Sequence, residues 1–278
     1  MLSYQHAYHA GNFADIHKHA VLVRLLAALQ RKDKPFCYLE THAGRGRYDL
    51  RSSEAQKTAE FKAGIGQLWG QSAAPLLAPL FEAVKGLNPD GKLRTYPGSP
   101  LIARASLRPQ DRMQLMELHP GEFEALKEVF RGDRQVGLHQ RDGFEGVLAL
   151  SPPAEKRGLV LVDPSYELKE DYQQVPQWSA KLFQRWSTAT LAIWYPLLPA
   201  GRHQLLLKGL ERSGLRKILV SELSVAPSDG EGMYGSGMAV VNTPWQLDEE
   251  LAQCLPGLAQ QLAGPGAAAP SLSWLVGE

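Results

Sequence analysis

The chain of 278 residues has only two cysteines, Cys37 and Cys254. Two lone thiols do not make a disulfide framework, and such side chains are more often small buried groups than metal ligands. Long apolar runs are also missing: no segment has 18 consecutive apolar residues, so we expect no transmembrane helix. The first twelve residues have no apolar stretch flanked by basic side chains, which favours a cytoplasmic protein that is not secreted and does not bind membranes.

An excess of one charge is missing as well. The chain has 30 Lys and Arg against 29 Asp and Glu, so the strongly basic composition of many nucleic-acid-binding proteins is absent. Residues 1–60 differ, with nine Lys and Arg, six Asp and Glu, and five of the eight histidines. This composition predicts either a local positive face or an ordinary solvated surface. No Cys/His or Glu/His grouping has the spacing of metal ligands, so we expect no metal site.

What is present is an alternation of strand-like and helical stretches. Repeated units of this kind predict an α/β fold, with a mostly parallel sheet and helices on both of its faces. The expected strands are residues 36–40, 112–118, 136–140, 159–162, 189–195, 217–225, 237–241 and 271–276. The expected helices are residues 13–30, 99–107, 121–130, 144–150, 171–186, 203–213 and 248–262, the first with one apolar side.

The segment that follows the first strand–helix unit has a different pattern. From residue 49 to about residue 96 there is no convincing strand, and residues 54–69 and 73–85 have helical patterns. We therefore expect a small helical insertion subdomain at 49–95 and a core made of residues 1–48 and 96–278.

The stretch GLVLVDPSY, residues 158–166, carries the most chemistry. Its apolar run is typical of a strand buried on both faces of a parallel sheet, and Pro164 ends that strand. Asp163, Pro164 and Tyr166 would then stand at the carboxyl end of a central strand, where ligands bind in open α/β sheets. Amino-group methyltransferases carry this tetrad as Asp-Pro-Pro-Tyr, so Ser165 is the irregular position. The alternative is a plain strand-to-loop turn.

Three earlier strand ends carry further polar signals. Thr41–Gly46 (THAGRG) is a glycine loop, although it lacks the G-x-G-x-x-G spacing of dinucleotide sites. Glu117 ends the second core strand and could accept hydrogen bonds from both ribose hydroxyls of a nucleoside cofactor. Asp142 and Gly143 follow the third and suit the amino group of an adenine ring, or simply cap a helix. Together with the tetrad, they match the arrangement of an S-adenosylmethionine site followed by an amino-methylation motif.

The tetrad can activate a poor nucleophile. The lone pair of an exocyclic aryl amine is delocalised into its ring. The Asp163 carboxylate and the Pro164 carbonyl can both accept hydrogen bonds from the amine, which favours a localised lone pair aimed at the methyl group. Asp163 can also take the released proton, and Tyr166 offers a ring on which an extruded base can stack.

Eight segments spread along the chain have a familiar combination of residues. They are LSYQHAYHAGNFADIHKH (2–19), LETHAGRGRY (39–48), YPGSPLIAR (96–104), ELHP (117–120), DGF (142–144), LVDPSYE (161–167), WYP (194–196) and GSGM (235–238). Together they resemble the bacterial 23S ribosomal RNA adenine-N6 methyltransferases of the RlmJ family. The resemblance covers essentially the whole chain, and the first three segments are its most specific part.

The resemblance implies a Rossmann-like S-adenosylmethionine-dependent methyltransferase fold with a small helical insertion. It implies a metal-free monomer that methylates one adenine, on free 23S rRNA rather than on assembled ribosomes, and releases S-adenosylhomocysteine. The cofactor contacts that it implies are His19, His42, Ser99, Glu117, Asp142, Gly143 and Asp163. The RNA-facing residues that it implies are Tyr4, His6 and Lys18, and the catalytic acid is Asp163.

Two alternatives stay open on the sequence. One is a DNA amino-methyltransferase, because the tetrad also occurs in DNA enzymes, although no large target-recognition domain is visible. The other is a non-catalytic RNA-binding protein on a methyltransferase fold, which only Ser165 favours.

Overall fold

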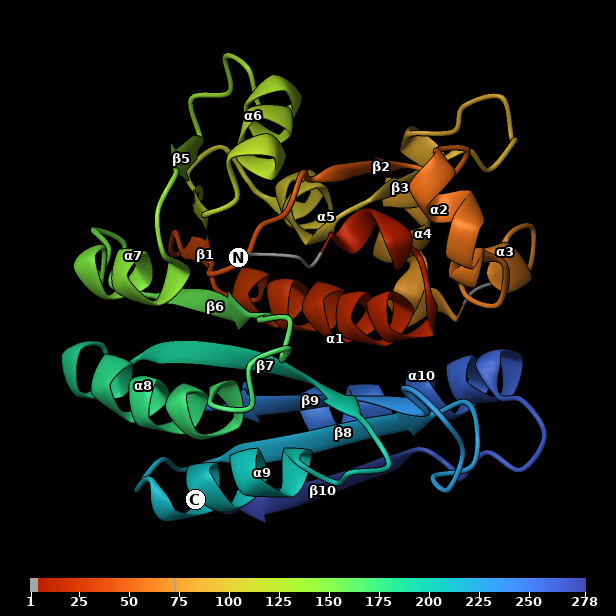
Figure 1. The fold of residues 1–278 in the computed structure, drawn as a ribbon. Coiled ribbons are helices and arrows are strands. Elements are labelled where there is room, and N and C mark those ends of the chain that lie inside the picture. Colours follow the sequence, from red (N-terminus) through yellow and green to blue (C-terminus); the bar gives the residue numbers. More distant parts are fainter. Residues whose placement is uncertain (1–4, 73) are drawn as a thin grey trace.

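A single eight-stranded sheet forms the centre of the computed structural model, which describes residues 5–72 and 74–278 (Figure 1). The strand order is β10-β8-β9-β7-β6-β1-β4-β5. Strands β7, β6, β1, β4 and β5 run parallel, whereas β9 is antiparallel to both β7 and β8, and β10 is antiparallel to β8. The strands are β1 Cys37–Glu40, β4 Arg112–Met116, β5 Val136–His139, β6 Gly158–Val162, β7 Ala189–Leu197, β8 Ile218–Ser224, β9 Gly235–Val241 and β10 Ser271–Val276.

The direction in which the chain builds the sheet reverses beside β1. From β1 the chain first adds β4 and β5 on one side, and then returns to add β6 and β7 on the other. The carboxyl ends of β1 and β6 therefore flank a switch point, which is where open α/β sheets bind ligands. This confirms the mostly parallel sheet that the sequence predicts.

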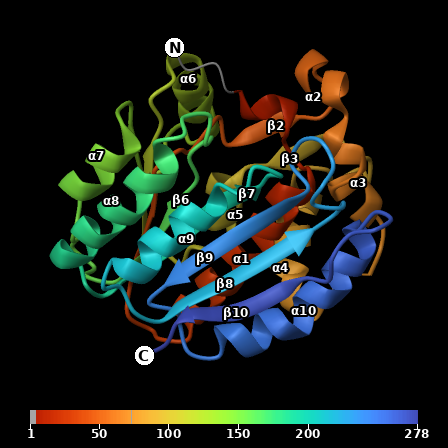
Figure 2. The same cartoon turned by 60° about the horizontal axis from the view of Figure 1, so that its bottom comes forward.

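Helices cover both faces of the sheet (Figures 1 and 2). One hydrophobic cluster includes apolar residues of α1, α4, α5, α6 and α10, and the other includes residues of α7, α8 and α9. In Figure 1, α1 and the pair α8 and α9 lie on opposite sides of β7. These helices are α1 Phe13–Gln30, α4 Ala78–Gly86, α5 Ser99–Ser106, α6 Pro120–Val129, α7 Gly143–Ala149, α8 Asp171–Arg185, α9 His203–Arg212 and α10 Leu247–Leu262.

Helix α1 has the predicted bounds but not the predicted exposure. It begins where the Asn12 side chain accepts a hydrogen bond from the backbone N–H of Asp15, at 2.9 Å. Apart from Phe13, Ala27 and Gln30, all its residues are buried, so a helix with one apolar side was the wrong expectation. The helix lies between the sheet and the α4–α5–α10 layer, so its polar residues also need partners inside the protein.

The segment between β1 and β4 contains short helices and one small ribbon. β2 (Arg47–Asp49) pairs antiparallel with β3 (Thr95–Pro97), so an unpredicted ribbon joins the two ends of the stretch from residue 49 to about residue 96, in which we expected no strand. The predicted helix at 54–69 is broken by Ala59, which has a φ of 54°. The short helices there are α2 Ser53–Thr58, η2 Glu60–Lys62, α3 Ile65–Leu68 and η3 Pro75–Leu77. The division into a core and an insertion subdomain at 49–95 stays a prediction.

The N-terminal segment lies against these short helices. Its first turn is η1, His6–Tyr8, and Glu60 accepts hydrogen bonds from His9 Nδ1 at 3.0 Å and Asn12 Nδ2 at 2.9 Å. The segment that enters α1 is thereby tied to the insertion. Across the described part of the chain, no helix combines the length and apolarity that crossing a membrane requires.

Candidate active site

A cavity of about 640 Å³ lies at the carboxyl ends of the parallel strands, beside the switch point. All the site residues predicted from the sequence line it, except Tyr4, which lies outside the described residues. Those lining residues are His6, Lys18, His19, His42, Ser99, Glu117, Asp142, Gly143, Asp163, Pro164 and Tyr166. The fold therefore brings six separate stretches of the chain to one cavity, although their roles stay predictions.

Glu117 braces the glycine loop. Its Oε2 accepts a hydrogen bond from Gly44 N at 2.8 Å, and its Oε1 accepts one from His119 N at 2.7 Å. Burial raises the pKa of this carboxyl, and the two backbone N–H groups oppose that rise. Each carboxylate oxygen can accept more than one hydrogen bond, so Glu117 keeps acceptor capacity toward the cavity.

Asp142 and Gly143 form the start of α7, directly beside that loop. Asp142 caps the helix by accepting from Glu145 N at 2.9 Å, so the capping role that the sequence left open is present. Gly143 lies so close to the loop that a Cβ atom there would stand 1.8 Å from the Thr41 carbonyl oxygen. This contact requires glycine and holds the N-terminus of α7 against the cavity.

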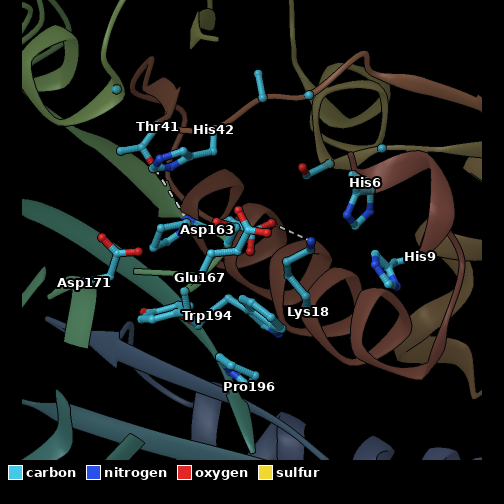
Figure 3. A pocket seen from close by; sticks show the side chains of 18 of the residues that line it. His6, His9, Lys18, Thr41, His42, Asp163, Glu167, Asp171, Trp194 and Pro196 are labelled. Carbon is cyan, nitrogen blue, oxygen red and sulfur yellow. Dashed lines mark hydrogen bonds and ion pairs between the residues drawn. The ribbon is translucent and has the colours of Figure 1, made fainter. Parts of the chain in front are cut away.

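Asp163 and Lys18 are in direct contact (Figure 3). Lys18 Nζ donates to Asp163 Oδ2 at 2.6 Å and also lies 2.9 Å from Asp15 Oδ1. Burial lowers the pKa of Lys18, but Asp15 and Asp163 outweigh that effect and hold the pKa above its usual range. The Lys18 side chain is 5% exposed, so it is an ammonium enclosed between two carboxylates rather than a surface cation.

Asp15 extends this charged cluster toward the N-terminal segment. Its Oδ2 accepts from His6 Nε2 and from Gly11 N, both at 2.9 Å. Burial would raise the pKa of Asp15, yet His6 and Lys18 outweigh it and keep the pKa well below its ordinary range. Asp15 could not be predicted as a site residue from the sequence, because a charge in the first turn of a helix is ordinarily solvated or caps that turn.

His19 presents a nitrogen that no other side chain uses. Its Nδ1 lies 2.8 Å from the Tyr96 hydroxyl, whereas Nε2 is buried without a hydrogen-bond partner among the described residues. Burial lowers the pKa of His19 to about 3, so the ring is neutral near pH 7. A buried polar atom in a cavity wall is costly unless a ligand or water satisfies it, which supports the predicted cofactor contact.

Glu40, at the end of β1, lies behind the cavity and was also missed. It is fully buried and accepts hydrogen bonds from the hydroxyls of Ser99 and, at 2.8 Å, Tyr38. Burial raises its pKa to about 8 although both hydroxyls oppose the rise. Its position directly before the glycine loop was the available signal, and its contact explains how Ser99 is held.

Two aromatic residues of the cavity wall differ in exposure: Tyr166 is buried and Trp194 is half-buried. The predicted stacking residue Tyr166 is 6% exposed; its hydroxyl donates to the Trp194 carbonyl at 2.7 Å, and its ring lies 4.6 Å from that of Tyr172. Trp194, at the carboxyl end of β7, is half-buried and lines the same cavity below Asp163 in Figure 3. We did not predict Trp194 from the sequence, where an aromatic residue in a buried strand is most often core.

Metal ligands do not gather anywhere in the described part of the chain: no three His, Cys, Asp or Glu side chains are placed to hold a metal ion. The carboxylates of the site instead accept from N–H and O–H groups, or pair with Lys18.

The sheet order, the antiparallel β9 beside β7, and the cavity at the carboxyl ends of the parallel strands define the Rossmann-like fold of S-adenosylmethionine-dependent methyltransferases. Within that class, residues 33–276 match the model of the family described as Ribosomal RNA large subunit methyltransferase D, RlmJ, and the chain belongs to this family. The family that the sequence resembles is thereby confirmed.

Individual relatives agree over the full length. The chain is 45% identical over 280 residues to the Ribosomal RNA large subunit methyltransferase J of Escherichia coli strain K12, and all of both chains is covered. It is 47% identical over 281 residues to the protein of the same name from Haemophilus influenzae, again with full coverage. A crystal structure of a Legionella pneumophila protein superposes with a TM-score of 0.88 at 38% identity, and covers 96% of this chain and 98% of that one.

Proposed function

We propose that this protein transfers a methyl group from S-adenosylmethionine to the exocyclic N6 of one adenine in 23S ribosomal RNA. The observation that carries the proposal is the Asp163-Pro164-Ser165-Tyr166 turn at the end of β6, which lies in one cavity with Glu117 and Asp142. The groups that would bind the amine and the two acids that would bind the cofactor's nucleoside therefore face the same space. The family, and the two relatives named as ribosomal RNA methyltransferases, support an RNA substrate.

The cavity suits the cofactor. Glu117 would accept from the ribose hydroxyls, while Asp142 and Gly143 would contact the adenine ring. His19, His42 and Ser99 would surround the amino-acid end, beside Asp163. The Nε2 atom of His19 has no partner among the described residues and could bond the cofactor there. When bound, S-adenosylmethionine supplies an electrophilic methyl group on a sulfonium.

The target amine would be held by acceptors on the tetrad. Lys18 donates to Oδ2 of Asp163 and leaves the carboxylate with acceptor capacity for an adenine N–H, and the Pro164 carbonyl can accept the second. The contact with Lys18 fixes the Asp163 side chain in the cavity wall, where the target amine would bind. The rate gain would come mainly from positioning the lone pair in line with the methyl group.

Proton release does not demand a strong base. An adenine whose N6 has just gained a methyl group carries positive charge on a strongly acidic N–H, and a nearby carboxylate can accept that proton even while paired with a cation. Asp163 is the described carboxylate on the tetrad itself, so we assign it this role. The cluster of Asp15, Lys18 and His6 beside it would spread the transient change in charge.

We further propose that the protein acts in the cytoplasm as a monomer, without a metal ion, on free RNA. The cavity is lined by residues from six separate stretches of one chain, which supports a site within a single molecule. The experiment is incubation of unmodified 23S RNA transcripts with labelled S-adenosylmethionine, followed by nucleoside analysis. N6-methyladenosine is the expected product; label in DNA substrates alone, or no label at all, would refute the assignment.

A further inference from the structure

Trp194 is held at both its backbone and its indole. The Tyr166 hydroxyl donates to its carbonyl at 2.7 Å, and its indole Nε1 donates to Ser236 Oγ on β9 at 3.0 Å. Lys18 Nζ lies 5.8 Å from the centre of the ring. The indole of Trp194 is therefore fixed by hydrogen bonds to the protein interior. It still lines the cavity, as Asp163 does.

The hydrogen bond to Ser236 continues into the core through His17 on α1. His17 Nδ1 lies 3.0 Å from Ser236 Oγ, and its Nε2 lies 2.9 Å from Ser221 Oγ on β8. All three side chains are at most 1% exposed. The result is a continuous chain from β8 through α1 and β9 to the indole at the cavity wall.

The chemistry of the groups fixes the direction of this chain at its Trp194 end. An indole N–H can only donate, so Ser236 Oγ must accept from Trp194. A neutral imidazole has one donor and one acceptor nitrogen, so in either tautomer His17 can bond Ser236 through Nδ1 and Ser221 through Nε2. Burial lowers the pKa of His17 to about 3, so the ring stays neutral throughout the pH range of an assay.

Stability alone does not account for three polar side chains in this position. Apolar residues of similar volume pack at least as well in a buried layer, whereas a polar network must satisfy every member. Here the network ends on a half-buried aromatic ring that lines the same cavity as Asp163. Lys18, which holds Asp163, is the next residue along α1, so one helix turn supports both groups.

We propose that His17, Ser221 and Ser236 form a buried hydrogen-bonded chain that sets the orientation of the Trp194 indole, and that this indole is a wall of the site for the target base. The proposal rests on the proposed function, because it takes the base to be an adenine of RNA. His17, Ser221 and Ser236 are positioning residues, since none of them lines the cavity. Base–aromatic stacking is the interaction that such a wall would supply.

A double-mutant cycle tests the chain. Ser236→Ala removes the acceptor of the indole N–H, and we expect the KM for 23S RNA to rise about ten-fold, as for the loss of one buried hydrogen bond. We expect kcat to fall less than the KM rises, and calorimetry to give an unchanged affinity for S-adenosylmethionine. Ser179→Ala is the matched control, because Ser179 is also buried but donates within α8, and its KM should not change.

Trp194→Phe keeps a ring but has no N–H. In that background Ser236→Ala should add less than about two-fold to the KM, because the group through which it acts is gone. A second ten-fold rise there would overturn the proposal, and so would an unchanged KM for Ser236→Ala alone.

Two variants of His17 keep the test valid if Ser236→Ala does not fold. The amide of His17→Asn can replace Nδ1 and preserve the bond to Ser236, whereas that of His17→Gln replaces Nε2 and preserves only the bond to Ser221. We expect the KM for 23S RNA to rise more in His17→Gln than in His17→Asn. The reverse order would contradict the proposed hydrogen-bonded chain.

A binding readout separates this inference from the proposed function. Adenosine monophosphate should quench the fluorescence of the wild-type protein through Trp194, and the quenching should be lost in Trp194→Phe and weakened in Ser236→Ala. Equal quenching in all three proteins overturns the inference. If transcripts are methylated at adenine N6 all the same, the proposed function survives that result.

Discussion

At the scale of single residues, the main surprise is where Lys18 lies. The family resemblance implied that Lys18 is an RNA-facing cation. The structure buries it between Asp15 and Asp163, three and 145 positions away along the chain. Only the contact with Asp163 depends on the tertiary fold. Because of it, Asp163 is already ion-paired when no substrate is bound.

Under the proposed function, Asp163 is the residue on which we expect methyl transfer to depend most. Asp163→Ala removes the acceptor for the target amine, so we expect methylation of 23S RNA to fall by at least about a hundred-fold. The protein should remain folded, because Asp163 ends a strand whose packing is apolar. Label incorporation measures the loss and circular dichroism checks the fold; activity near that of the wild type would refute the mechanism.

Lys18→Ala probes the ion pair. It leaves Asp15 and Asp163 facing each other without the ammonium between them, so we expect the base to be misplaced and RNA engagement to weaken by about ten-fold or more. Affinity for S-adenosylmethionine should change less. Filter binding with RNA and calorimetry with the cofactor give the two numbers, and a larger loss of cofactor affinity would place Lys18 in the cofactor pocket instead.

At the scale of elements, most helices and strands were predictable. Residues 13–30, 189–195 and 248–262 were assigned from apolar periodicity, and the observed elements differ by two residues or fewer at each end. The β2–β3 ribbon was not predictable, because each strand has only three residues and is defined by its pairing with the other. A periodic pattern can be recognised only over several residues. Short strands that are stabilised by pairing with a distant segment therefore cannot be predicted from it.

The contact between the glycine loop and α7 is an element-scale feature that a single atom can test. Gly143→Ala would push the helix N-terminus off Thr41, so we expect the affinity for S-adenosylmethionine to drop at least about ten-fold and the protein to lose about 1–3 kcal/mol of stability. Gly257→Ala is the control: a Cβ atom added at Gly257, in α10, would meet nothing within 4 Å, so this change should be neutral or stabilising. Equal effects of the two substitutions would contradict the close approach.

The end of β1 should give the protein a pH-dependent stability. Burial raises the pKa of Glu40 from 4.5 to about 8, so between these values the folded protein holds a proton that the unfolded chain has released. This contribution to the free energy of unfolding is therefore greatest below pH 4.5 and decreases as the pH rises to about 8. Relative to Glu40→Gln, the wild type should lose on the order of 2–3 kcal/mol from about pH 6 to about pH 8 in urea unfolding. Parallel curves for the two proteins would show that Glu40 does not titrate in this range.

At the scale of the whole molecule, the near-zero net charge constrains how RNA is bound. The chain has a formal charge of +1. Lys18, which lines the cavity, pairs with Asp15 and Asp163, and Arg45 pairs with Glu122, which also lines the cavity. We expect few phosphate contacts, about two to four, which gives a slope of log affinity against log salt between about −1.4 and −2.8 for single-stranded RNA. Titrations with a 23S fragment in increasing KCl measure the slope, and a much steeper one would reveal a basic surface that these pairings conceal.

The sequence by itself determined the family, the α/β alternation and the strand-end residues that meet at the cavity. Those signals are local: a buried strand, the turn that ends it and the acid in that turn are neighbours along the chain. Only the tertiary structure decided which groups touch. It pairs Lys18 with Asp163, leaves His19 Nε2 unpartnered among the described residues, packs Tyr166 against Tyr172 and places Trp194 at the wall. Hydrogen bonds and burial join residues that are far apart in sequence, and no local pattern encodes such distances.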